Sequence, residues 1–63
     1  MSATPITFHG DPGWRFAIVE DCTIIERAAG AGVTYDVFQQ IDGDEIRIAK
    51  GQTLDAAIRT ARH

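Results

Sequence analysis

Hydrophobic and polar residues alternate along much of the chain, and this period of two is typical of β-strands. The alternation predicts strands at about 14–19, 33–41 and 45–50, and a shorter first strand at about 5–9. The segment 14–19 is rich in aromatic and β-branched residues, which favour strands. We therefore expect a sheet built from short strands that follow one another in sequence.

Two sequences with strong turn propensity separate these runs. Gly-Asp-Pro-Gly at 10–13 contains a proline that presets φ for the second turn position and a glycine that accepts the positive φ of the third. Asp-Gly-Asp at 42–44 supplies the positive φ that tight hairpin turns require. Both predict antiparallel hairpins, and thus a meander rather than βαβ units.

The segment between these hairpins fits two structures. As a helix, it would be capped by Asp21, would bury a stripe that includes Cys22 and Ile25, and would end at Gly30. As a strand at about 23–29, it has no cleanly apolar face. The adjacent β-branched residues Ile24 and Ile25, and the short spacing after Val19, favour the strand.

The last segment, at about 53–62, has the period of an amphipathic helix. Thr53 is a good N-cap, and the apolar residues recur at the i, i+3, i+4 and i+7 positions. Asp55 in the first turn and the basic residues near the end suit the helix dipole. The residues of this stripe are Leu54, Ala57, Ile58 and Ala61.

These elements predict an α+β fold, a small antiparallel β-meander of four to five short strands packed on one face by a C-terminal amphipathic helix. One helix covers one face of a sheet, so the other face is left for solvent or a partner. We expect the following side chains to point toward the helix: Trp14, Phe16, Ile18, Val37, Ile46 and Ile48. Parity then sends another set outward: Arg15, Ala17, Val19, Phe38 and Arg47, joined by Ile25 and Arg27.

The composition is that of one small globular domain spanning 1–63. The chain has 63 residues, of which 44% are hydrophobic and 24% charged, which argues against disorder. A chain this short buries only about 60% of its unfolded surface, so self-association would stabilise it. The single cysteine and the absence of a signal-peptide pattern at the start predict a cytoplasmic protein with no membrane partner.

No motif for catalysis, a cofactor or a metal is evident. His9, Cys22 and His63 lack the paired spacing of a zinc site, and Cys22 is expected to pack as a small hydrophobic residue. The glycines at 30–32 precede a strand rather than a helix, unlike those of a dinucleotide site. The acidic residues fall mainly at turns, where aspartate is common. We therefore assign no catalytic, cofactor-binding or metal residues, and expect no enzyme and no cofactor.

The outward sheet face is the remaining candidate for function, because it mixes arginines with apolar residues on an acidic protein. We expect a small non-enzymatic protein-interaction or accessory module that binds another protein or itself, as a homodimer. The alternative is a nucleic-acid-binding module using the same face, which the net charge of −3 disfavours; an enzyme ranks third. The candidate interaction residues are Arg15, Val19, Ile25, Arg27, Phe38 and Arg47.

Overall fold

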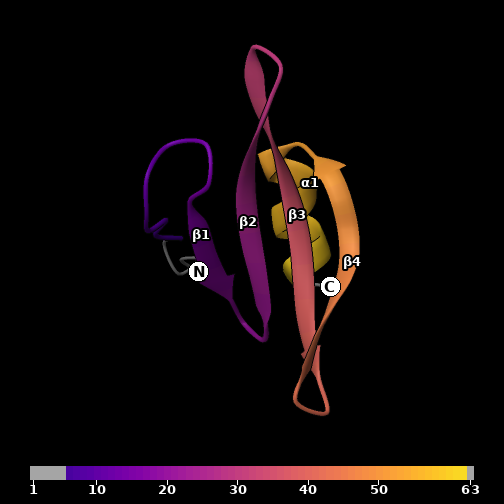
Figure 1. Cartoon of the computed structure of the whole chain (residues 1–63). Helices are drawn as coiled ribbons and strands as arrows, with labels where there is room; N and C mark the ends of the chain where they lie inside the picture. The colour runs from indigo at the N-terminus through magenta and orange to yellow at the C-terminus, as the bar shows by residue number, and fades with distance from the viewer. Residues whose placement is uncertain (1–5, 63) are drawn as a thin grey trace, which may run out of the picture.

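The computed structural model describes residues 6–62 as a four-stranded antiparallel sheet followed by one helix. The elements are β1 (Phe16–Val19), β2 (Cys22–Ala29), β3 (Gly32–Ile41), β4 (Asp44–Gln52) and α1 (Leu54–Arg62). The strands lie in chain order, and α1 packs behind the sheet (Figure 1). The predicted α+β meander with a C-terminal helix on one face is therefore confirmed.

The hairpin between β3 and β4 follows the local sequence closely. Ile41 pairs with Asp44, so Asp42 and Gly43 alone form the turn. Their φ angles are +52° and +85°, and positive φ at both central positions is the geometry that Asp-Gly favours in tight hairpins. The sequence 42–44 thus fixes the register of the two longest strands.

The ambiguous segment forms a strand rather than a helix. β2 pairs with β1 on one side and with β3 on the other, so its backbone donors and acceptors are satisfied in both directions. Cys22, Ile24 and Glu26 alternate on the buried face. A single charged residue on this face obscures the alternation in the sequence, and its burial is explained by the ion pair described below.

The N-terminal segment does not form the strand predicted at 5–9. Pro5 lies outside the described residues, and within 6–9 the ladder is limited to one isolated bridge between His9 and Phe16. The turn after it does form, since the Trp14 amide donates to the Asp11 carbonyl at 3.1 Å. Gly13 has the predicted positive φ, at +96°.

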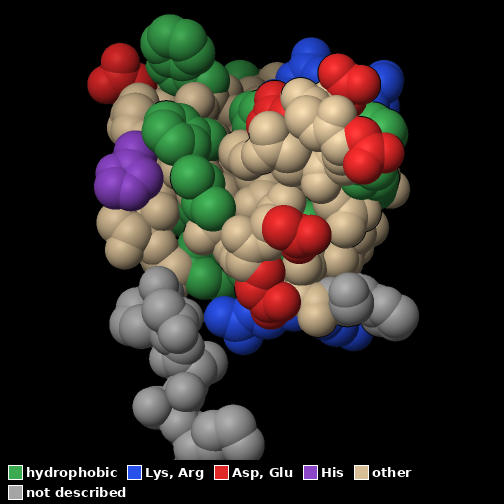
Figure 2. Space-filling model, turned by 90° about the horizontal axis from the view of Figure 1, so that it is seen from below, with side chains coloured by type: hydrophobic (Ala, Val, Ile, Leu, Met, Phe, Trp, Pro, Cys, Tyr) green, Lys and Arg blue, Asp and Glu red, His purple; other side chains and the backbone are tan. Residues whose placement is uncertain are grey.

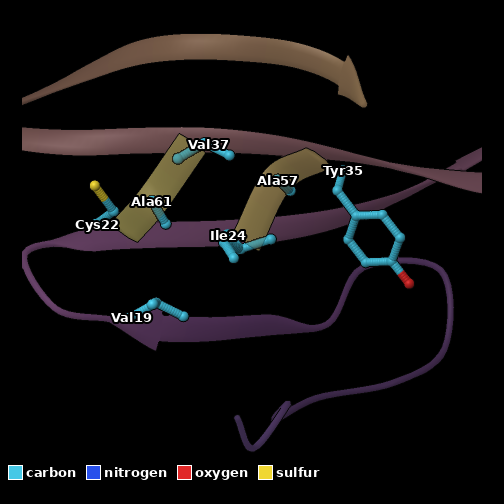
Figure 3. Packing of buried hydrophobic residues seen from close by; sticks show 7 residues of the cluster. All are labelled: Val19, Cys22, Ile24, Tyr35, Val37, Ala57 and Ala61. Atoms are coloured by element: carbon cyan, nitrogen blue, oxygen red, sulfur yellow. The ribbon is translucent and has the colours of Figure 1, made fainter. Parts of the chain in front are cut away.

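The core lies between the sheet and α1. Figure 3 shows side chains from β1, β2 and β3 converging on two alanines of the helix. Ala57 and Ala61 are buried, while Leu54 and Ile58 pack against the cluster at its margin, so the predicted helix stripe is confirmed. Thr53 caps the helix through a 3.3 Å hydrogen bond from the Ala56 amide. The buried cluster comprises Val19, Cys22, Ile24, Tyr35, Val37, Ala57 and Ala61.

The side chains of residues 14–19 that were predicted to point toward the helix point away from it. Trp14 and Ile18 are each 69% exposed, whereas Ala17 is fully buried. The register explains this, because Ala17 lies opposite Ile24 and Val19 opposite Cys22 in the helix-covered face. Both parities of this segment are apolar, so alternation alone cannot choose between them. The smaller side chains occupy the space beneath the helix, and the larger ones point away from it.

The predicted inward position of Ile48 is wrong, whereas Ile46 lies on the helix side of the sheet, because it pairs with Gln39, which pairs with the core residue Cys22. Ile46 and Ile48 are 46% and 42% exposed. Val37 pairs with Ala49 but Phe38 with Arg47, so Ile48 is an extra residue in β4 at a β-bulge. The bulge gives the inward position to Ala49, which packs against the core.

Truncation of the largest fully buried apolar side chain tests this core. We expect Ile24→Ala to lower the free energy of unfolding by about 2–5 kcal/mol. This approaches the total stability of a domain of this size, roughly 3–9 kcal/mol. Urea denaturation measures the loss, with Ile46→Ala as the matched control at an exposed position. Equal losses in the two variants would show that the core is assigned incorrectly.

Candidate functional site

The sheet face opposite α1, here called the open face, is set by the strand register. One row across it runs from Phe16 through Ile25 to Asp36. A neighbouring row joins Ile18, Thr23, Phe38 and Arg47. α1 packs on the other side of the sheet, as Figure 1 shows. Large apolar and charged side chains therefore share this uncovered surface.

The half of the open face nearest β1 is an apolar groove. It has a volume of about 450 Å³ and is lined by Trp14, Phe16, Ile18, Thr23, Ile25 and Glu45. Trp14 and Ile18 are the most exposed of the large hydrophobic residues. Figure 2 shows hydrophobic side chains gathered on the side of the molecule where β1 lies. Such a cluster of exposed apolar side chains is typical of contact surfaces.

The other half of the open face carries a basic patch, Arg27, Arg47 and Lys50, around one buried carboxylate. Asp36 is 1% exposed and accepts hydrogen bonds from Arg27 at 3.1 Å and from the Gly51 amide at 3.0 Å. Burial opposes ionisation of Asp36, but these bonds outweigh it and lower the pKa of its carboxyl. The three basic residues thus exceed the one acid they surround.

A second buried carboxylate lies on the helix side of the sheet. Glu26 is 2% exposed and accepts two hydrogen bonds from the Arg15 guanidinium, at 2.9 and 2.6 Å. The Gly13 amide and the Tyr35 hydroxyl donate to it at 2.9 and 2.8 Å. The bonds from Arg15, then Gly13, then Tyr35 lower the pKa of Glu26 from 4.5 to about 2.

An aromatic contact extends this arrangement to the N-terminal segment. The Phe8 ring lies 5.9 Å from that of Tyr35, and the Arg15 guanidinium lies 5.4 Å from the Phe8 centroid. The Glu26 cluster, defined as Phe8, Gly13, Arg15, Glu26 and Tyr35, therefore anchors the loop before β1 to β2 and β3. Because every member is used for packing or pairing, we assign the cluster a structural role.

The structure separates the residues predicted as an interaction face. Ile25, Arg27, Phe38 and Arg47 lie on the open face, and their role in binding stays a prediction. The outward position predicted for Val19 is wrong, because Val19 is 5% exposed in the core.

The outward position predicted for Arg15 is also wrong, because Arg15 pairs with Glu26 on the helix side of the sheet. Trp14, Phe16 and Ile18 were missed as surface residues. The size of these side chains indicates a surface position in the sequence, because three large side chains would overfill the space beneath a helix whose buried residues are alanines.

The remaining candidates for chemistry are His9, Cys22 and His63. Within residues 6–62 no three His, Cys, Asp or Glu side chains gather in a way that would hold a metal ion. His63 lies outside the described residues. The Cys22 thiol is 3% exposed, and burial, with a smaller contribution from Asp21, raises its pKa. In the same part of the chain, no helix has the length and apolarity needed to cross a membrane.

The Glu26 cluster makes stability depend on acidity. Because the pKa of Glu26 is depressed in the folded state, its stabilisation is fully present above pH 4.5 and is lost as the pH falls to about 2. We expect Glu26→Gln to lower the free energy of unfolding at neutral pH, by an amount that shrinks across this range. Urea denaturation of both proteins at several pH values measures the difference, and a constant difference would contradict the assignment.

Cys22 should react slowly with a thiol reagent. Burial limits access to the sulfur, and its raised pKa keeps the fraction of reactive thiolate small. We expect labelling to be slow in buffer and fast in urea. Rapid labelling of the folded protein would show that Cys22 is accessible and would reopen a nucleophilic or redox role.

Comparison with known proteins identifies no relative of this chain. No family model matches the chain, and neither the curated proteins nor the solved structures provide a significant match. The surfaces of the chain itself are therefore the basis for assigning a function.

Proposed function

We propose that this chain is a non-enzymatic protein-interaction module that self-associates through the open face as a homodimer. The observation that carries the proposal is the apolar groove, in which Trp14 and Ile18 are each 69% exposed. Tryptophan, like tyrosine and arginine, is enriched at interface hot spots. Burying a large apolar side chain stabilises a complex by roughly 1.5–3 kcal/mol before the cost of association.

The open face has the dimensions that a specific interface needs. The four strands are 4, 8, 10 and 9 residues long. At ~3.3 Å per residue and about 4.8 Å between strands, they form a face with a flat area of roughly 500 Å². A standard interface buries about 800 Å² on each partner, about a sixth of this chain's accessible surface of 4557 Å². Two such faces together bury about 1,000 Å², which is the lower limit for a specific interface.

The sheet edges are less suited to association than the open face. The outer side of β1 is occupied in part by the bridge between His9 and Phe16. β4, the other edge, contains register shifts between Arg47 and Gln52, and such bulges hinder pairing with a further strand. A two-fold dimer that forms through the open face instead buries the apolar groove of each copy in the interface.

A nucleic-acid-binding module is the second candidate, supported by the basic patch and by an exposed tryptophan on the same face. Arginines and lysines bind phosphates, and an exposed indole ring stacks on an unpaired base. Two observations weigh against it. Asp36 neutralises part of the patch, and the chain has a net charge of −3.

A charged residue in the apolar groove should prevent dimer formation. We expect wild type to sediment as a dimer at high concentration, and Ile18→Glu to remain folded but monomeric, because a carboxylate would be buried against hydrocarbon. Val33→Glu is the matched control, since Val33 is 45% exposed near the β2–β3 hairpin and away from the groove.

A monomeric wild type at all concentrations would reject the proposal. If that monomer bound single-stranded oligonucleotide with an affinity that fell steeply with salt, the second candidate would take its place.

A further inference from the structure

The charges of the molecule are unequally distributed along the strands. The β1–β2 and β3–β4 turns lie at the same end of the meander (Figure 1), and both are acidic. We call this the acidic end, and it comprises Glu20, Asp21, Asp42, Asp44 and Glu45. In the basic patch, Arg27 and Lys50 lie toward the opposite end, near the β2–β3 turn. Within β4, Glu45 and Lys50 are separated by about 16 Å at ~3.3 Å per residue.

The open face is also asymmetric across the strands. The apolar groove lies on the β1 and β2 side, with Glu45 at its margin. Asp36, Arg47 and Lys50 lie on β3 and β4. A copy placed on this face therefore meets hydrocarbon on one side and charge on the other, and its orientation decides which groups meet.

Two simple two-fold axes are available in the plane of the face. An axis parallel to the strands would put the apolar groove of one copy over the charged half of the other, and one acidic end over the other acidic end. Burying charges against hydrocarbon and opposing like charges are both costly. An axis perpendicular to the strands puts groove on groove and each acidic end over the partner's basic patch.

Resting on the proposed self-association, we infer that the partner is a second copy packed face to face with its strands running in the opposite direction. Lys50 of each copy lies near the acidic end of the other, and the two apolar grooves form the centre of the contact. Complementary ends offset the repulsion between two chains of net charge −3. Aligned packing of two sheets is a common arrangement in β-sandwiches.

Reversal of one charge tests the orientation first. Lys50→Glu would place a carboxylate beside the partner's acidic end twice in each dimer, and we expect the dimer dissociation constant to rise roughly tenfold. Lys50 is exposed, so the fold should be kept, and circular dichroism checks this. A dissociation constant unchanged from wild type would contradict the inferred contact.

The chain with both charges exchanged, Glu45→Lys with Lys50→Glu, provides the decisive test because its net charge equals that of wild type. In the inferred dimer its ends are again complementary, so it should self-associate more tightly than the single variant. It should not mix with wild type, because like charges would then meet. Native mass spectrometry with ¹⁵N-labelled wild type measures mixing, and the neutral pair Glu45→Gln with Lys50→Gln is the control that mixes freely.

The outcomes separate the two proposals. If wild type is monomeric, the proposed function and the orientation both fail. If wild type is a dimer that Ile18→Glu disrupts, but the exchanged chain mixes with wild type as freely as the neutral control or more so, only the orientation is overturned.

Discussion

The pairing of the buried Glu26 carboxylate is the constraint on which the rest of the structure depends. Arg15 binds it through two nitrogens, and the Gly13 amide and the Tyr35 hydroxyl complete its hydrogen bonds. A buried carboxylate without such partners is strongly destabilising. The segment before β1 is therefore held along the edge of β2, where the Arg15 and Gly13 carbonyls accept hydrogen bonds from β2 amides at 2.6 and 2.9 Å.

This anchorage decides which side chains reach the surface. With Arg15 on the helix side, strand alternation sends Trp14 and Phe16 to the other face, and Ile18 follows. The same alternation places the small residue Ala17 on the helix side of the sheet, opposite Ile24, where it is fully buried. The register that fills the core with small side chains therefore also forms the apolar groove. Because Arg15 pairs with Glu26 on the helix side, the large apolar side chains next to it in sequence are exposed on the other face.

Much of the fold could be predicted from local patterns, but the candidate site depends on choices that those patterns leave open. The turn at Asp42 and Gly43 and the helix stripe each have one physical solution, and both were confirmed. The parity of β1 was not predictable from alternation, since both of its faces are apolar. The bulge at Ile48 and the burial of Glu26 arise from tertiary pairing, which leaves no local trace in the sequence.

The fluorescence of Trp14, the sole tryptophan of the sequence, provides the most direct measurement of whether the open face is covered in solution. Acrylamide quenching should be strong in dilute protein, where the indole is exposed, and should weaken as concentration rises and a second copy covers the groove. The emission maximum should shift to shorter wavelength over the same range. Quenching and emission that stay constant up to high concentration would contradict the account, because the exposed indole would then have no partner.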